Sequence, residues 1–498
     1  MFVFLLLVLL FVCLGWAWAA WMRARSYWAE RGVPFQPPHP LLGSLTFLQR
    51  KNMVCFFIFK ICFLIRHRFQ LPSDSPYFGM WLFWRPTLVI KDPQIARRVL
   101  VKDFDHFRNR FLSSGKTDPI GGRNIFTNND PHWSSIRRRL TPVFTASKLR
   151  ALYPLIDGKA KDLIKRIRND FEIYADYTTD IIGAAAFGVN CDATLTGHSA
   201  MRNITKEFST YSVKRGLEFA VMFFWPELCD TLRVTFFPKK TTEYFRKVFK
   251  TIVAERGGWD AQIPETRDLL DAILKLGQQL REDGEESTED TVISQAAIFL
   301  QGGFDTSAVS LTYCTYELAF HLEIQEKLYN EIHEAYTKNG NIDPSTLVDL
   351  PYLDCVLKEV LRKYPAMGFL DRITVKDYQI DDKLTIMKGT PVYVNAIGMH
   401  YDPKYFPNPE QFDPDRFAEG NALEPFTYMP FGEGPRSCIG TRFAYISLRS
   451  ALSNVILNYK VVPRSTSPHP SEIRIDPRGI FMAPDRELVV DFIPRNQM

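Results

Sequence analysis

The chain has 498 residues, of which 46% are hydrophobic and 14% aromatic, so it can bury one large core or a few domains of ordinary size. Its 61 basic and 56 acidic residues give a formal net charge of +5, which excludes the strongly basic composition of a typical nucleic-acid-binding protein. Eight cysteines, scattered without a CxxC pair or a His/Cys cluster, exclude a dense disulfide scaffold and a locally encoded zinc site, and they favour free thiols in a reducing compartment.

The first predicted element is an uncharged apolar segment, MFVFLLLVLLFVCLGWAWAAWM, at residues 1–22. As a helix it would be about 33 Å long, which is enough to cross a bilayer. Arg23 and Arg25 follow at once and no basic residue precedes the segment, so the positive-inside rule places the main body in the cytosol. Ala17 and Ala19 also allow a cleaved signal peptide, but the segment is long for one and lacks a basic start. We therefore expect a transmembrane anchor at residues 1–22.

A proline-rich connector, RGVPFQPPHPLLGS at residues 31–44, comes next. Its prolines make it stiff and extended rather than helical. The rest of the sequence contains no second linker of this kind, no low-complexity tract and no internal repeat. We therefore expect a linker over residues 23–44 and a single large domain over residues 45–498.

Helical patterns dominate that domain, and strand patterns are few. Residues 81–92, 383–394 and 486–493 have the composition and alternation typical of strands. Long helical patterns fill residues 130–365, among them an apolar stretch at residues 291–332 that is far longer than an average helix. The predicted fold class is mostly α with a minor β-sheet.

The helical stretch HWSSIRRRLTPVF, at residues 132–144, is the first that carries candidate functional side chains. Trp133 and Arg137 are four residues apart, so they share one helix face. An aromatic–arginine pair of this kind is often plain packing. Arg138 and Arg139 point elsewhere, and they form either a solvated face or a basic docking face for a partner protein.

The long apolar stretch contains two adjacent glycines in QGGFDTS, residues 301–307. A glycine inside a helix costs about 1 kcal/mol relative to alanine, and two of them together can also end a helix. The apolar pattern continues past them, so we expect Gly302 and Gly303 to admit a bulky group or to widen the helix locally. Asp305 and Thr306 follow within one turn, where a carboxylate and a hydroxyl can relay protons through water.

The segment KEVLRKYP, residues 358–365, places an acid and an arginine on one helix face. Glu359 and Arg362 are three residues apart, and at a protein surface such a pair contributes only a few tenths of a kcal/mol. The proline ends this helix. Two further arginines follow downstream, Arg372 in FLDRITV and Arg416 in FDPDRF.

The last stretch of interest is FGEGPRSCIG, residues 431–440, which places one cysteine on a glycine-rich loop. A lone cysteine is more often a small buried apolar residue. Here the sequence turns helical after Cys438, so the thiol lies near a helix N-terminus with Arg436 close by, and both favour a thiolate. A thiolate offered alone suits a metal that brings most of its other ligands, as haem does with four porphyrin nitrogens.

This loop resembles the cysteine-ligand loop of the cytochrome P-450 superfamily, F-G-x-G-x-R-x-C-x-G, at every fixed position. The glycine pair with its acid and threonine resembles the distal helix motif A/G-G-x-D/E-T of the same family. The acid–arginine pair resembles its ExxR motif, and HWSSIR its W-x-x-x-R motif. The segments KDFDHFRNR (102–110) and YTTDIIGAAAFG (177–188) resemble the insect-type branch of the microsomal, xenobiotic-metabolising clan. The resemblance runs from the anchor to the C-terminus.

The resemblance implies a single large haem domain of that family's fold and roles for individual residues. Cys438 is the proximal iron ligand, Phe431 packs near its sulfur, and Arg436 holds a haem propionate. Asp305 feeds protons from solvent, and Thr306 assists cleavage of the O–O bond. The propionates are bound by three further side chains: Trp133, Arg137 and Arg372. A structural triad, which is not catalytic, holds the cysteine loop: Glu359, Arg362 and Arg416.

The activity implied by the resemblance is that of a haem-thiolate monooxygenase with haem b. It inserts one oxygen atom from O2 into a lipophilic small molecule such as a xenobiotic, a hormone or a lipid. The electrons come from NADPH through a separate NADPH–cytochrome P-450 reductase, with cytochrome b5 as a further donor. The implied location is the cytosolic face of the endoplasmic reticulum membrane, and no nucleic acid is involved.

The resemblance also suggests where a substrate lies. Residues 113–126, 367–370 and 480–482 and Phe304 are candidates by their position in the family. Residues 366–368, Ala-Met-Gly, replace the proline-rich segment common in the family, so specificity does not transfer from relatives. The apolar segment LEFAVMFFWPEL, residues 217–228, is either a buried helix or one that dips into the bilayer.

Three other functions compete with this one. A haem-thiolate isomerase or dehydratase would rearrange peroxides without a reductase, and the retained acid–threonine pair argues against it. A haem-based gas sensor would need an output module, and none is visible in the sequence. A structural membrane protein would make four motifs in family order a coincidence.

Overall fold

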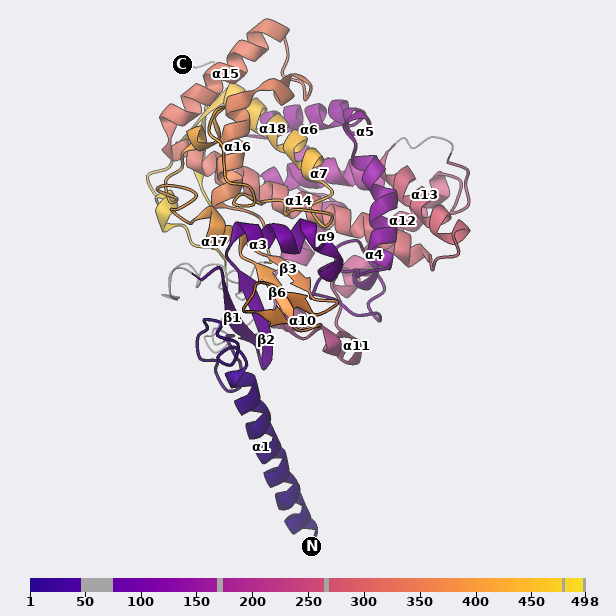
Figure 1. Cartoon of the computed structure of the whole chain (residues 1–498). Coiled ribbons are helices and arrows are strands. Elements are labelled where there is room, and N and C mark those ends of the chain that lie inside the picture. Colours follow the sequence, from indigo (N-terminus) through magenta and orange to yellow (C-terminus); the bar gives the residue numbers. More distant parts are fainter. Residues whose placement is uncertain (46–74, 168–172, 264–267, 477–479, 496–498) are drawn as a thin grey trace.

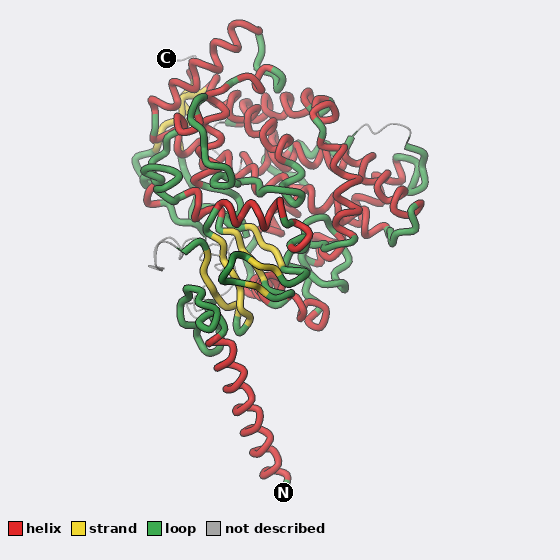
Figure 2. The backbone as a smooth tube through the Cα atoms, in the orientation of Figure 1, coloured by secondary structure: helices red, strands yellow, loops and turns green. Residues whose placement is uncertain are grey.

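The computed structural model describes residues 1–45, 75–167, 173–263, 268–476 and 480–495. Most of these residues are helical, which confirms the predicted class, and the largest sheet lies on the side from which the N-terminal helix projects (Figures 1 and 2). The α-helices are α1 (Phe2–Ser26), α3 (Pro93–Arg97), α4 (His132–Leu140), α5 (Ala146–Arg150), α6 (Tyr153–Arg166), α7 (Ile173–Phe187), α8 (Ala193–Thr196), α9 (Ala200–Ser209), α10 (Val213–Phe224), α11 (Cys229–Leu232), α12 (Lys239–Glu255), α13 (Leu269–Glu282), α14 (Glu289–Phe320), α15 (Leu322–Asn339), α16 (Pro351–Lys363), α17 (Ala396–His400) and α18 (Thr441–Asn458). The strands are β1 (Tyr77–Leu82), β2 (Arg85–Ile90), β3 (Leu370–Ile373), β4 (Tyr378–Gln379), β5 (Thr385–Ile386), β6 (Pro391–Val394), β7 (Tyr459–Pro463) and β8 (Val490–Pro494).

Helix α1 stands away from the rest of the molecule (Figure 1). It ends at Ser26, four residues beyond the expected anchor, and it carries Arg23 and Arg25 in its last turn. Its part Leu7–Ser26 is long and apolar enough to cross a membrane, by length and composition. The exposed apolar side chains of α1 have no protein to pack against, which is the pattern expected of a segment that meets lipid.

The connector after α1 is folded onto the sheet rather than hanging free. Trp28 is fully buried, and its indole N–H donates to the carbonyl of Met80 at 3.0 Å. The indole N–H of Trp81 donates back to the carbonyl of Ala24 at 2.8 Å. Gly79 makes room for this arrangement, since a Cβ there would lie 2.3 Å from Trp28 Cγ. These contacts fix the end of α1 against β1.

The largest sheet has the strand order β1-β2-β6-β3. β1 and β2 form an antiparallel hairpin, β2 pairs with β6 in parallel, and β6 pairs with β3 antiparallel. The predicted strand region 81–92 is therefore confirmed as the second half of a hairpin. The sheet brings β3 from the C-terminal half of the chain beside N-terminal residues, as the bridge between Asn109 and Ile373 shows.

Helix α14 runs through the core and packs against α7, α13, α16 and α18. It begins with a capping box formed by Thr288 and Thr291. It is buried on nearly every side, which explains why its sequence is apolar all round. The apolar pattern over 291–332 is nevertheless two helices, because His321 leaves the helical conformation (φ −123°, ψ 71°) and α15 starts at the next residue.

Two other predictions can be compared with the structure. The C-terminal strand β8 begins at Val490, so the predicted strand 486–493 is correct only in its second half. Of the eight cysteines, six are free thiols, as expected, and Cys55 and Cys62 lie outside the described residues.

Candidate active site

The middle of α14 and the cysteine loop, residues 431–440, line one cavity of about 290 Å³. Its wall is mainly apolar, and nine phenylalanines contribute to it: Phe126, Phe144, Phe208, Phe236, Phe299, Phe369, Phe431, Phe443 and Phe481. A wall of this kind favours ligands with a large apolar surface.

Cys438 lies in the wall of this cavity with its side chain open to it. The loop that presents it is closed by a hydrogen bond from the Cys438 N–H to the carbonyl of Phe431, at 2.9 Å. Gly434 has φ +76°, and a Cβ there would lie 2.0 Å from the carbonyl oxygen of Leu100, so only glycine fits. Helix α18 begins at Thr441, three residues after the cysteine, as the sequence predicted.

The charges around the sulfur differ from the expected ones. Burial raises the pKa of the Cys438 thiol, whereas the Gly440 N–H, the Thr441 hydroxyl, Arg137 and Arg110 act in the opposite direction. Among the cations, Arg137 and Arg110 are the two that favour the thiolate form of Cys438. No other group of three His, Cys, Asp or Glu that could hold a metal occurs in the described part of the chain. A metal held here would receive a single protein ligand.

Four arginines gather beside the cysteine, and we call them the cation belt: Arg110, Arg137, Arg372 and Arg436. Three of them line the cavity, and Arg372 is fully buried on the same face of β3 as Leu370, which also lines it. Asp371 pairs with Arg110 at 2.8 Å. For the other three arginines, the described residues offer no ion pair. The belt therefore carries a surplus of buried positive charge.

The three arginines of the belt without an ion pair among the described residues differ in their other polar contacts. Arg436 lies over the ring of Trp133, with 4.0 Å from its Cζ to the ring centroid, and it donates to the carbonyl of Asn128 at 3.2 Å. Arg372 donates to the carbonyl of Asp371 at 2.8 Å, and its Nε has no hydrogen-bond partner among the described residues. The Arg137 guanidinium has neither a hydrogen bond nor an ion pair within the described ranges.

An anionic cofactor fits this belt. Burial, followed by repulsion from Arg110, lowers the pKa of Arg436 to about 8 and that of Arg372 to about 9. Shifts in this direction mean that the buried cations lack a counter-charge. A haem brings two carboxylates, four nitrogen ligands for its iron and a flat apolar body, and these match the cation belt, the single Cys438 ligand and the phenylalanine wall.

Two further arginines, Arg362 and Arg416, are paired with a carboxylate of the protein itself. We call these arginines and the two side chains that bind them or lie beside them the proximal network: Glu359, Arg362, His400 and Arg416. The Arg362 Nε and Nη2 donate to the two oxygens of Glu359 at 2.7 and 2.8 Å, and both side chains are fully buried. Arg416 Nε lies 3.5 Å from Glu359, and its Nη2 donates to the carbonyl of Asn408 at 2.9 Å. The predicted grouping of Glu359 with two arginines, Arg362 and Arg416, is confirmed.

His400 connects this network to the cysteine loop. Its Nδ1 donates to the carbonyl of Arg362 at 3.0 Å, and its Nε2 accepts the N–H of Met429 at 2.9 Å. This arrangement requires a neutral imidazole. Burial and the neighbouring Arg362 lower the pKa of His400 to about 3, so it is neutral at physiological pH. Met429 lies two residues before the cysteine loop, so this hydrogen bond joins the proximal network to the start of the loop.

The two adjacent glycines of α14, Gly302 and Gly303, have different surroundings. A Cβ at Gly302 would meet no atom within 4 Å, and this residue lines the cavity. A Cβ at Gly303 would lie 2.8 Å from Cγ1 of Ile182, so this glycine allows α7 to pack closely on α14. Helix α14 continues through both glycines without a break, so the local widening considered from the sequence is not observed.

The acid and the threonine that follow face different ways. Thr306 lines the cavity and donates its hydroxyl to the carbonyl of Gly302 at 2.6 Å. Asp305 lines a second cavity of about 130 Å³ and accepts hydrogen bonds from Ser209 Oγ at 3.0 Å and Gln301 Nε2 at 3.3 Å. Burial raises the pKa of Asp305 to about 6 against the opposing effects of these donors.

Some site residues were missed or misplaced by sequence reasoning. Arg110 belongs to the cation belt, and the arginine-rich segment that contains it was the available signal. Phe208 and Phe236 line the cavity although nothing marked them in advance. Phe304, expected near the substrate, is buried and does not line the cavity.

The two arginines considered for docking a partner protein differ in exposure. Arg139 pairs with Asp283 and Glu285, so only Arg138 is well exposed.

Comparison with known proteins agrees with this geometry. Residues 33–490 match the sequence model of the family described as Cytochrome P450. Cytochrome P450 6k1 of Blattella germanica is 34% identical over 90% of this chain and 89% of its own. Probable cytochrome P450 6g2 of Drosophila melanogaster is 31% identical over 96% of both chains, and Cytochrome P450 6A1 of Musca domestica is 30% identical over 94% of this chain and 93% of its own. These relatives are insect proteins, in agreement with the insect branch that the sequence resembles.

Proposed function

Because this chain belongs to the cytochrome P450 family and is a haem-thiolate monooxygenase, we propose that it oxidises lipophilic small molecules at the endoplasmic reticulum membrane, with NADPH as the electron source through a separate reductase. The observation that carries the proposal is the combination of one cysteine open to an apolar cavity with a belt of four buried or partly buried arginines, three of which have no ion pair among the described residues.

When bound, a haem held by a thiolate would supply the activation of O2. Cys438 is the residue that would provide this thiolate. The cation belt and Trp133 would hold the propionates, with Arg137 the most available donor because its guanidinium has no partner within the described ranges. Phe431 is expected to shield the sulfur from water, since its ring lies in the wall beside Cys438 and against Tyr445, at 5.4 Å between ring centroids.

Protons are proposed to reach the site through α14. Thr306 presents its hydroxyl at the cavity wall, where it would pass protons into the cavity, and Asp305 is the neighbouring acid. A carboxyl group whose pKa is raised to about 6 can both take up and release a proton near neutral pH, which is what a general acid requires.

The substrate class follows from the cavity wall. Ile125 and Phe126, Met367 to Leu370 and Ile480 and Phe481 are the candidate contacts, and all three segments except Gly368 contribute to the wall. They present aromatic and aliphatic surface with few polar groups, so apolar contacts rather than a hydrogen-bond code would orient the substrate. This favours a broad range of lipophilic molecules.

We propose one surface of the domain for contact with the membrane and another residue for contact with the reductase. The helix α1 would hold the domain on the membrane, with the body in the cytosol. Helix α10 lies beside the β1–β2 hairpin (Figure 1). Leu217 of α10 and Trp225 are exposed, and the Trp225 ring lies 5.2 Å from that of Phe83, in the turn between β1 and β2. This surface would rest on the bilayer. Arg138, on α4, is a candidate contact for an acidic reductase.

The test is the carbon monoxide difference spectrum of the dithionite-reduced full-length protein beside Cys438→Ala. A strongly red-shifted Soret band that is lost in the variant is expected for thiolate ligation. A histidine-type spectrum that the substitution leaves unchanged would refute the assignment of Cys438. Turnover of an alkoxycoumarin probe should then require NADPH and reductase, whereas turnover of a hydroperoxide without them would favour the isomerase or dehydratase alternative.

A further inference from the structure

The two neighbouring residues Asp305 and Thr306 face two different cavities. Thr306 lines the haem cavity, and Asp305 lines the second one. Phe208, Ile480 and Phe481 line both, so the two spaces share a thin apolar wall. The acid and the hydroxyl that are expected to work together therefore open onto separate compartments.

The second cavity is a chamber suited to water. Its polar wall residues come from α9, α10, α14 and the C-terminal region: Ser209, Thr210, Tyr211, Arg215, Asp305 and Asp476. Its volume of about 130 Å³ compares with about 30 Å³ for one water molecule, so several fit, and the wall offers each of them polar partners. Ser209 and Thr210 are also exposed to solvent, so the chamber reaches the surface.

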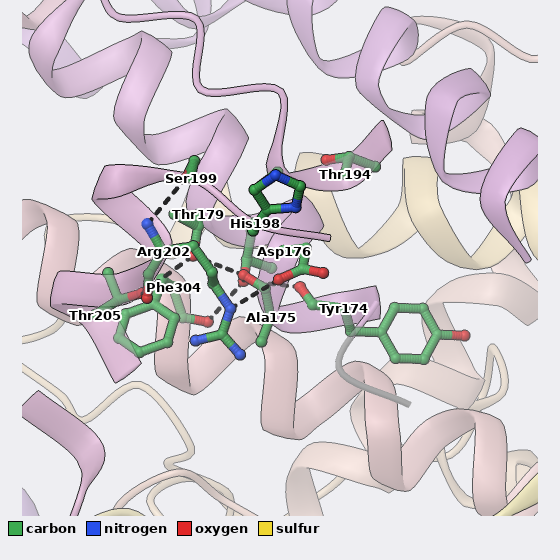
Figure 3. A network of polar contacts seen from close by, with 12 residues as sticks. Tyr174, Ala175, Asp176, Thr179, Thr194, His198, Ser199, Arg202, Thr205 and Phe304 are labelled. Atoms are coloured by element: carbon green, nitrogen blue, oxygen red, sulfur yellow. Dashed lines mark hydrogen bonds and ion pairs between the residues drawn. The ribbon is translucent and has the colours of Figure 1, made fainter. Parts of the chain in front are cut away.

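The Asp305 carboxylate is held on the chamber side by α9 and by its own helix. Ser209 Oγ donates to it at 3.0 Å, and Gln301 Nε2 at 3.3 Å. Helix α9 is itself fixed to α7, since Arg202 Nε donates to the buried Asp176 at 2.7 Å (Figure 3). The serine donor thus sits on a helix with a defined position rather than on a mobile loop.

We propose that Ser209 is a positioning residue that holds the Asp305 carboxylate in the chamber, so that water in this chamber, and not in the haem cavity, supplies the protons that Asp305 passes toward Thr306. The inference deepens the proposed function and rests on the acid role of Asp305 stated there. The protons balance over one cycle. The protonated Asp305 gives one proton to the Thr306 hydroxyl oxygen, and Thr306 releases its own hydroxyl proton into the haem cavity. Asp305 then takes one proton from chamber water, and solvent replaces that proton.

The same turn of α9 connects the acid to the substrate. Phe208 lies in the wall of the haem cavity, and Ser209 is the next residue. A substrate that presses on Phe208 acts on the turn that carries the hydrogen bond to Asp305. Proton supply would in this way depend on whether the apolar cavity is filled.

The charges around Asp305 set the direction of the expected effect. Burial is the largest influence and raises its pKa to about 6, while the Ser209 hydroxyl, the charge of Arg202 and the Gln301 amide lower it. Arg215 and Asp476 are the other charged groups in the chamber wall. A hydrogen bond to a carboxylate stabilises its charged form, so removal of the Ser209 hydroxyl raises the pKa further.

The experiment uses full-length ferric holoprotein and compares Ser209→Ala with Ser209→Thr, which keeps the hydroxyl. The matched control is Thr205→Val, which removes a buried hydroxyl of the same helix that donates to the carbonyl of Arg202 instead of to Asp305. The infrared band of the protonated Asp305 carboxyl group is assigned by its loss in Asp305→Asn. Its intensity as a function of pH gives the midpoint of the Asp305 titration. With reductase, NADPH and an alkoxycoumarin, the ratio of product to hydrogen peroxide gives the coupling.

Ser209→Ala is expected to raise the midpoint by about one pH unit and to lower the coupling about threefold. Ser209→Thr should restore the parent midpoint and the parent coupling, and Thr205→Val should change neither quantity. Thr210→Trp, which fills the chamber, should lower the coupling while the carbon monoxide spectrum stays unchanged. If Asp305→Asn impairs coupling while Ser209→Ala behaves as the parent, Ser209 is only a packing contact and the inference is overturned. If Asp305→Asn itself leaves the coupling unchanged, the acid role fails and the inference falls with it.

Discussion

The proximal network and the cation belt are both built from buried arginines, yet they differ in what balances them. In the proximal network, Glu359 accepts two short bonds from Arg362 and lies near Arg416. In the cation belt, one carboxylate, Asp371, stands against four guanidinium groups. Burial lowers the pKa of the belt residue Arg436 to about 8, whereas the Arg362 side chain is held by a carboxylate at 2.7 Å.

The difference separates structure from binding. A buried cation is costly unless it is paired, so a chain keeps an unpaired cluster only where something else completes it. Within the described residues, the proximal network pairs both of its arginines with the Glu359 carboxylate, although Arg416 Nε makes no hydrogen bond, and the network supports the loop of Cys438. The cation belt is incomplete and is the part of the wall that can receive the two carboxylates of a haem. Substitutions in the two sets should therefore have opposite consequences.

The largest effect is expected from Arg362→Ala in the proximal network. It removes the two short hydrogen bonds to the buried Glu359 carboxylate and leaves Arg416, at 3.5 Å, as the cation nearest to it, which costs about 3–5 kcal/mol of folding free energy. Thermal unfolding and the yield of protein with a thiolate-type carbon monoxide spectrum measure the loss. Arg281→Ala is the control, because that arginine is exposed and its partner Asp260 lies 3.3 Å away, where an exposed pair is worth about 1 kcal/mol or less. Equal losses for the two variants would contradict the structural role.

In the cation belt, Arg137→Met should weaken haem binding without destabilising the polypeptide. Loss of a charged hydrogen bond worth about 1.5–3 kcal/mol predicts haem release at least about tenfold faster, measured by transfer to apomyoglobin. The free energy of unfolding should stay the same or rise, since a partly buried cation without an ion pair among the described residues is removed. A variant that unfolds readily but keeps its haem would place Arg137 with the proximal network instead.

The pH dependence of stability tests the link between the proximal network and the loop. The pKa of His400 is about 3 in the folded protein and about 6.5 in an unfolded chain. Between these values the unfolded state binds a proton that the folded state does not, so stability is lost as the pH falls below about 6.5. At pH 5 the loss is about 2 kcal/mol.

Urea unfolding at pH 7.5 and pH 5 would measure this contribution against His400→Gln. The glutamine variant should start less stable at pH 7.5, because it breaks the contact with Met429, but it should lose about 2 kcal/mol less on acidification. Identical pH dependence in the two proteins would show that His400 is not buried in its neutral form.

The smallest effect is expected outside both arginine sets. Arg138 is exposed, so Arg138→Ala should change the folding free energy by about 0.5 kcal/mol or less. If Arg138 docks the reductase, the rate of electron transfer should fall about two- to threefold at low salt and less at high salt. A decrease that does not depend on ionic strength would argue against a docking role.

Several features of this protein were set by local sequence alone. The apolar segment of α1, the stop at Pro365 and the glycines around Cys438 each act over a few residues, where backbone geometry and hydrophobic length leave little choice. The order of the sequence motifs along the chain identified the family, and it predicted Cys438 as the single cysteine ligand. The pairing of Glu359 with Arg362 was also predictable, because three residues on a helix bring two side chains together.

Only the tertiary structure decided the rest. It broke one continuous apolar pattern into α14 and α15 at His321, and it turned Asp305 and Thr306 toward separate cavities although they are neighbours in sequence. It brought Arg110 beside Arg137 and Phe208 into the cavity wall. It also separated paired arginines from unpaired ones, because the charge balance of a buried group depends on which distant side chains the fold packs around it, and a local pattern carries no record of them.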